Sequence, residues 1–117
     1  MVEIKNDNVA YFDVDETLLI YDFPQEKMNE AIQVSIEGGP SVYVVPHRVH
    51  VEQVRRHKAW GNGVVVWSRS GWQWAKAAVI ALGLDKYVDA VAAKPFYYYD
   101  DKKCCEILGE HRYKEDK

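Results

Sequence analysis

Cysteine is scarce in this chain of 117 residues, and its two copies, Cys104 and Cys105, are adjacent. That spacing disfavours an intrachain disulfide bond, and two cysteines are too few for a structural zinc site. No stretch approaches the roughly 18 apolar residues of a transmembrane helix, and the polar N-terminus has no apolar signal-peptide core. We therefore expect a reduced, cytoplasmic protein that uses its cysteines for helix packing.

A large excess of charge is also absent. The formal net charge is −3, which gives no general attraction to nucleic acid or to an anionic membrane, although it is compatible with a local basic patch. Hydrophobic residues make up 48% and charged residues 28%, which excludes a disordered chain. The length predicts a single domain over residues 1–117.

The hydrophobic pattern predicts an α/β domain. Continuous apolar runs predict four strands, over residues 8–14, 63–67, 87–92 and 96–99. Helical periodicity with end signals predicts three helices, over residues 46–60, 72–82 and 102–108. Alternating segments on either side of a Gly-Gly-Pro turn predict a β-hairpin, with strands at 31–36 and 41–45.

Helix 46–60 carries many basic residues, namely His47, Arg48, His50, Arg55, Arg56, His57 and Lys58. We expect them to form a solvated face, because no carboxylate or cysteine completes a metal site at helical spacing. The alternative is a basic surface that guides a phosphorylated polymer. The residues expected to be buried are Val51, Val54 and Trp60 on this helix, and Trp72, Ala75, Val79 and Leu82 on the next.

Two carboxylates, Asp13 and Asp15, follow the first apolar run. A buried strand carries charge only at its end, where water or a metal ion can solvate it. In an open parallel sheet, ligands bind at the carboxyl ends of the strands. The spacing therefore indicates a cation site or a nucleophile, and the alternative is a polar turn capped by aspartate.

Further polar residues stand at the ends of the other predicted strands. Ser68 ends the second strand, Lys94 follows the third, and Asp100-Asp101 end the fourth. Each has an ordinary explanation on its own: a helix cap for Ser68 and the acidic pair, and a solvated surface lysine for Lys94. Parallel strands would bring all of these residues to one edge, which suits phosphoryl transfer.

Asp13-x-Asp15-x-Thr17, Ser68, Lys94 and Asp100-Asp101 resemble, in this order, motifs I to IV of the haloacid dehalogenase (HAD) superfamily. The resemblance covers roughly residues 8–108. It implies a Rossmann-like three-layer sandwich with a mainly parallel sheet. A small β-hairpin flap, about residues 31–45, would replace the cap domain and leave the site open to a large substrate.

The resemblance also implies roles for the residues of motif I. Asp13 would be the nucleophile that forms an aspartyl-phosphate, and a Mg²⁺ ligand. Asp15 would be the general acid and then the base, and its backbone carbonyl would bind the metal ion. Thr17 would support the loop beside the substrate.

The later motifs would bind the phosphoryl group and complete the metal site. Ser68 would donate a hydrogen bond to a phosphoryl oxygen, and Lys94 would neutralise charge between Asp13 and the phosphoryl group. Asp101 is expected to bind Mg²⁺ directly, with Asp100 in the outer shell. Arg69 either holds a second anionic part of the substrate or faces solvent.

These roles predict a Mg²⁺-dependent phosphatase acting on a small phosphorylated molecule, a nucleotide or a nucleic-acid end, with no membrane partner. The alternative is a catalytically weak binding or regulatory module that works with a partner protein. A phosphoryl-transferring half of a kinase–phosphatase system ranks last, because the sequence has no Gly-rich phosphate loop. The oligomeric state is left open.

Overall fold

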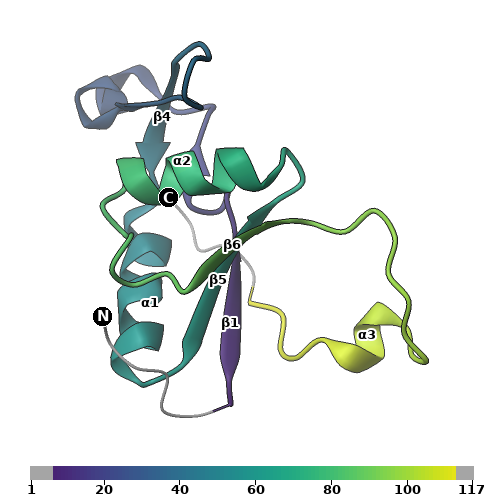
Figure 1. The fold of residues 1–117 in the computed structure, drawn as a ribbon. Coiled ribbons are helices and arrows are strands. Elements are labelled where there is room, and N and C mark those ends of the chain that lie inside the picture. Colours follow the sequence, from purple (N-terminus) through teal and green to yellow (C-terminus); the bar gives the residue numbers. More distant parts are fainter. Residues whose placement is uncertain (1–6, 113–117) are drawn as a thin grey trace.

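A parallel sheet of three strands lies at the centre of the computed structural model, which describes residues 7–112 (Figure 1). The strands are β1 (Val9–Asp13), β5 (Gly63–Ser68) and β6 (Ala90–Ala93), in the order β1-β5-β6. These are three of the four predicted strands of the body. Their register sets Asp13 beside Trp67 and Trp67 beside Ala92, so all three strands end at one edge.

Both long helices cover the same face of this sheet. They are α1 (Arg48–Ala59) and α2 (Trp72–Ala81), as predicted within a few residues. Val64 and Val66, which alternate along β5, are fully buried on this face. One continuous core joins them to buried residues of both helices, namely Val51, Val54, Ala75, Ala78 and Val79. None of the helices within residues 7–112 is long and apolar enough to cross a membrane.

The opposite face of the sheet has no helical layer among the described residues. Val9 is 51% exposed and Tyr11 is 54% exposed. The predicted strand 96–99 is wrong: after Lys94 the chain leaves the sheet, and α3 (Cys104–Ile107) stands apart from it (Figure 1). Pro95 has no N–H to offer to a sheet ladder, which explains why pairing stops there. The expected three-layer sandwich therefore has two layers within residues 7–112.

Residues 95–112 are exposed along their whole length. The cysteines lie in this segment as exposed free thiols, so the expectation that they serve helix packing is wrong. The segment carries a cluster of exposed apolar side chains, namely Phe96, Tyr97, Tyr98, Tyr99, Ile107 and Leu108.

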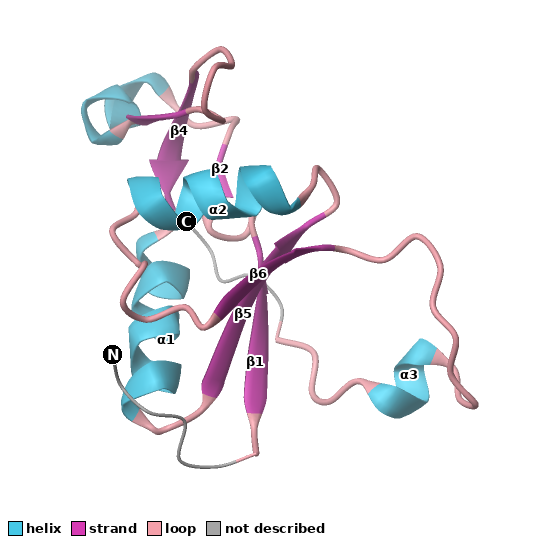
Figure 2. Cartoon of the chain, in the orientation of Figure 1, coloured by secondary structure: helices cyan, strands magenta, loops and turns pink. Residues whose placement is uncertain are grey.

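The predicted hairpin is confirmed as part of a second, antiparallel sheet (Figure 2). Its strands are β3 (Ile32–Val34) and β4 (Val42–Pro46), and the short strand β2 (Leu19–Ile20) completes the order β2-β4-β3. The 3₁₀ helix η1 (Gln25–Glu30) lies within residues 20–30, where the break at Pro24 predicts a loop. Val34 and Val44 are buried in the same core as the body, so the hairpin is packed down rather than free.

Several side chains lie opposite to their predicted positions. Trp60 is 61% exposed and Trp72 is about half exposed, whereas both were expected in the core. Trp74 is buried instead of Trp72, because its position faces the β-sheet and the polar atom of its indole has an acceptor there. His47, His50 and Lys58 are buried, so the solvated basic face is wrong at these three residues.

Lys58 is the largest fully buried side chain of the described residues, with 1% of it exposed. Its Nζ lies 2.5 Å from Oδ2 of Asp89, and the same oxygen accepts the N–H of Val64 at 2.8 Å. The Asp89 N–H in turn donates to the Val64 carbonyl at 2.9 Å. This ion pair, in which Lys58 is buried and the Asp89 side chain is 18% exposed, therefore ties α1 to β5 and to the start of β6.

We predict that Asp89→Ala lowers the free energy of unfolding by about 3–5 kcal/mol, because it leaves the Lys58 ammonium buried without its carboxylate. Urea denaturation followed by circular dichroism measures the change. Asp85→Ala, which removes a nearby exposed carboxylate, is the matched control and should change stability by less than about 0.5 kcal/mol. Equal effects of the two substitutions would show that the buried pair contributes no more than a surface charge.

Candidate active site

Asp13 and Lys94 meet at the carboxyl edge of the parallel sheet. Nζ of Lys94 lies 3.1 Å from Oδ1 of Asp13, and both side chains are partly exposed. The Thr17 hydroxyl donates to Oδ2 of Asp13 at 3.4 Å. The Lys94 N–H donates to the Ser68 carbonyl at 3.0 Å. Four of the predicted site residues, Asp13, Thr17, Ser68 and Lys94, are thus brought together, although they come from three segments distant in sequence.

A tight turn after β1 holds the first motif in place. The Val14 carbonyl accepts the N–H groups of Thr17, Leu18 and Leu19 at 2.9–3.2 Å. Glu16 has φ of 62°, in the left-handed region that costs a residue with a Cβ roughly 1–2 kcal/mol. Its carboxylate accepts the Tyr21 N–H at 2.8 Å, and this contact helps to offset the strain.

Two buried histidines support this turn from α1. Nδ1 of His50 lies 2.8 Å from the Thr17 carbonyl oxygen, and the His47 N–H donates to the Leu18 carbonyl at 2.9 Å. The two imidazole rings stack with their centroids 3.9 Å apart. The start of α1 therefore fixes the loop, in place of the solvated basic face that the sequence predicted there.

Three donors from different elements hold the Asp15 carboxylate. Oδ1 accepts the Tyr21 hydroxyl at 2.5 Å and the Trp74 indole N–H at 2.9 Å. The Ser70 hydroxyl donates to Oδ2 at 3.4 Å. The pKa of the Tyr21 phenol is raised well above its ordinary value. The largest cause is burial, followed by the hydrogen bond from Tyr21 to Asp15 and by the charge of Asp15.

Tyr21 and Trp74 were missed by the sequence reasoning. Tyr21 lies in the predicted loop 20–30, and the apolar stripe of α2 predicts that Trp72 is its buried tryptophan. For Trp74 the available signal was chemical: a buried tryptophan needs an acceptor for its indole N–H, and Asp15 is one near the same sheet edge. Tyr21 is 40% exposed and gave no such signal.

Ser68 and Arg69 lie beside this edge with different exposure. Ser68 is fully buried, and its hydroxyl accepts the Ser70 N–H at 3.0 Å, so in this structure it shapes the turn into α2. Donation from this hydroxyl to a phosphoryl oxygen stays a prediction. The Arg69 guanidinium lies over the Phe96 ring, 4.7 Å from its centroid.

The acidic pair is not gathered with Asp13 and Asp15. Asp100 and Asp101 are exposed, and the Asp100 carboxylate accepts the Lys102 N–H at 2.9 Å in a local turn. Within residues 7–112 no three His, Cys, Asp or Glu side chains are grouped to hold a metal ion. Asp13 is partly exposed beside Lys94, so Asp13 and the Asp15 carbonyl are the groups that would hold a Mg²⁺ ion here. With so few protein ligands, the ion would keep most of its waters.

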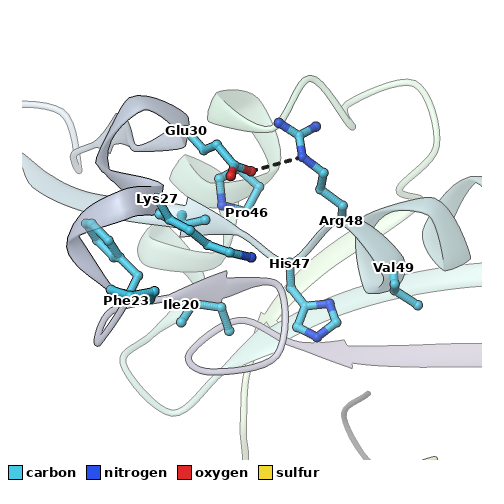
Figure 3. Close-up of a pocket in the computed structure, with 10 residues that line it drawn as sticks. Ile20, Phe23, Lys27, Glu30, Pro46, His47, Arg48 and Val49 are labelled. Carbon is cyan, nitrogen blue, oxygen red and sulfur yellow. Dashed lines mark hydrogen bonds and ion pairs between the residues drawn. The ribbon is translucent and has the colours of Figure 1, made fainter. Parts of the chain in front are cut away.

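A pocket of about 230 Å³ lies away from these residues, between η1, β4 and the start of α1 (Figure 3). Phe23 and Ile20 give it apolar walls, and the ion pair of Arg48 with Glu30, at 3.3 Å, lies along it. None of the predicted site residues lines this pocket. The candidate active site at the sheet edge therefore lies outside this pocket.

Comparison with protein-family models, with curated proteins and with solved structures found no match for this chain. The resemblance to the HAD superfamily therefore stays a prediction from the sequence motifs alone.

We predict that Tyr21→Phe lowers the free energy of unfolding by about 1 kcal/mol at pH 7, through loss of the hydrogen bond to Asp15. Because the folded-state pKa of Tyr21 lies above its ordinary value of 10.0, the bound proton stabilises the folded state. The wild-type advantage is therefore complete below pH 10.0 and is lost as the pH rises through the raised pKa.

Urea denaturation of both proteins at neutral and alkaline pH measures this difference. Tyr97→Phe, at an exposed tyrosine outside the site, is the control for the loss of one surface hydroxyl. A wild-type advantage that stays constant as the pH rises well above 10.0 would contradict the contact with Asp15.

Proposed function

We propose that this protein is a Mg²⁺-dependent phosphatase that hydrolyses phosphate monoesters through an aspartyl-phosphate on Asp13. The observation that carries the proposal is the contact of Asp13 with Lys94, at 3.1 Å, where the tips of β1, β5 and β6 meet. A partly exposed carboxylate next to a cation is a nucleophile beside a group that attracts the phosphoryl oxygens. A HAD-like fold is part of the same proposal.

The reaction proceeds in two displacements. In the first, an Asp13 oxygen bonds to phosphorus while the bond to the leaving oxygen breaks, and Asp15 gives that oxygen its proton. In the second, water attacks the aspartyl-phosphate, Asp15 takes a proton from the water, and phosphate leaves as the Asp13 carboxylate is restored. Asp15 ends the cycle protonated, as it began.

Charge stabilisation comes from groups around the reacting phosphorus. Lys94 neutralises the equatorial oxygens, and the Ser70 hydroxyl and the backbone at the start of α2 lie on the same side as Asp15. Mg²⁺, held by Asp13 and the Asp15 carbonyl, would supply further positive charge for the phosphoryl oxygens. Tyr21 and Trp74 keep the Asp15 carboxyl in one position during both displacements.

The second candidate is a binding module that works with a partner protein. Its specific support is the separation of the acidic pair from Asp13, because a site without that pair has fewer metal ligands. The two candidates predict opposite results with a simple substrate, so one experiment separates them.

We predict that the purified protein hydrolyses p-nitrophenyl phosphate with Mg²⁺ and loses this activity in EDTA. Asp13→Asn should lower kcat by about a thousandfold or more, because the amide cannot form the acyl phosphate. Lys76→Ala, which removes an exposed lysine of α2, is the control for a change of surface charge and should retain full activity. A folded protein that hydrolyses nothing, with or without Mg²⁺, would favour the binding module.

We further predict that Asp15→Asn discriminates between leaving groups. An alkyl phosphate needs a proton on its leaving oxygen, so its kcat/KM should fall by about 10²–10⁴-fold. Nitrophenolate leaves without a proton, so the first displacement with p-nitrophenyl phosphate should be slowed much less. Burst kinetics on both substrates measure that step directly. An equal loss of the first step on both substrates would remove Asp15 from the role of general acid.

A further inference from the structure

The sheet face opposite the helices presents two aromatic rings beside the candidate active site. The rings of Tyr11 and Trp67 lie 4.7 Å apart between centroids, tilted by 58°. Tyr11 is 54% exposed, whereas Trp67 is partly covered. We call these two rings the aromatic platform. Exposed aromatic rings are surfaces on which nucleobases can stack.

The platform and the nucleophile share one face of β1. Side chains alternate along a strand, so Tyr11 and Asp13 point to the same side, with Cα atoms about 6.6 Å apart. In the sheet register Asp13 is paired with Trp67. Nζ of Lys94, which contacts Asp13, lies 5.8 Å from the centroid of the Trp67 ring. A phosphoryl group on Asp13 would therefore lie next to the platform.

A second pair of a cation and an aromatic ring, Arg69 and Phe96, lies at the same edge. The Arg69 guanidinium is 4.7 Å from the centroid of Phe96, and this ring is strongly exposed. Arg69 directly follows Ser68, whose carbonyl is bonded to the Lys94 N–H. The edge thus combines exposed rings with cations, as sites for single-stranded nucleic acid do: bases stack on the rings and phosphates contact the cations.

We propose that the aromatic platform binds the nucleobase of a nucleoside phosphate whose phosphoryl group lies at Asp13 and Lys94. This inference rests on the proposed function and narrows its substrate class to nucleotides, free or at the end of a single strand. The base stacks on Tyr11, and the sugar spans the step from residue 11 to residue 13 on the face of β1.

Charge favours this ligand over a second protein copy as the occupant of the platform. Lysine is depleted in the buried centres of protein interfaces, yet Lys94 lies over Trp67. The net charge of −3 gives no long-range attraction, so binding depends on stacking and on Lys94 and Arg69. With two phosphate contacts, the affinity for a single strand should fall with salt with a logarithmic slope of only about −1.4.

The test uses the full chain carrying Asp13→Asn, which binds without turnover. Fluorescence anisotropy is measured with short oligothymidylates that carry a phosphate at the 3′ or the 5′ end and a dye at the other. Adding Tyr11→Ala should weaken binding about tenfold, whereas Tyr11→Phe, which keeps the ring, should retain it. Tyr43→Ala, at an exposed tyrosine of β4, is the matched control and should bind like the parent.

Competition experiments identify the form of the ligand. Displacement of the probe by thymidine monophosphate at a similar concentration supports a free nucleotide, and displacement only by phosphorylated strands supports a strand end. Displacement by glycerol phosphate as effective as by the nucleotides would overturn the inference. Equal binding by the Tyr11→Ala and parent proteins would do the same.

Sedimentation of the same proteins tests the competing occupant. A dimer that dissociates on Tyr11→Ala and does not bind the oligonucleotide would assign the platform to a second copy.

The same experiments distinguish failure of this inference from failure of the proposed function. Hydrolysis of p-nitrophenyl phosphate without a Tyr11 effect on binding removes only the inference. Tyr11-dependent binding in a protein that hydrolyses no phosphate ester removes the phosphatase and keeps the nucleotide site.

Discussion

The contact of the buried Lys58 ammonium with Asp89 fixes the framework on which the candidate site depends. Asp89 accepts the Lys58 ammonium and the Val64 N–H, and it donates its own N–H to the Val64 carbonyl. These bonds set the register in which β6 begins beside β5. From that start the strand delivers Lys94 to the Ser68 carbonyl and to the Asp13 carboxylate. A buried charge of this kind is costly unless it is paired, so the pair admits few other arrangements of α1, β5 and β6.

The site itself is formed by backbone geometry more than by a cavity. Three parallel strands end at one edge. The turn after β1 is closed by hydrogen bonds to the Val14 carbonyl. The strained φ of Glu16 belongs to this turn, at a position where glycine would adopt the same backbone conformation without steric cost. The imidazole of His50, on α1, contacts this turn at the Thr17 carbonyl. The edge is therefore shaped from inside the core, while its outer surface stays open.

Much of the framework could be predicted from the sequence because continuous apolar runs and turn signals are local. The strands at 8–14 and 63–67, the hairpin and both long helices were predicted on this basis, and the meeting of Asp13 with Lys94 followed from parallel strands. The pattern could not show that Pro95 ends the pairing, so the strand at 96–99 and a third layer were predicted wrongly. The pattern also could not show which face of α1 and which face of α2 is buried. Burial of Lys58 and Trp74 depends on partners far away in the sequence, Asp89 and Asp15.

The surroundings of Asp15 place two demands on one carboxyl group. It must be held in one orientation, and Tyr21, Trp74 and Ser70 all donate to it. In the proposed reaction the same group must also give a proton to the leaving oxygen and take one from water. The two shorter hydrogen bonds, from Tyr21 and Trp74, both go to Oδ1. Oδ2 has only the 3.4 Å contact with the Ser70 hydroxyl. In the proposed reaction the donors to Oδ1 therefore fix where the carboxyl lies, and Oδ2 is the oxygen that exchanges the proton.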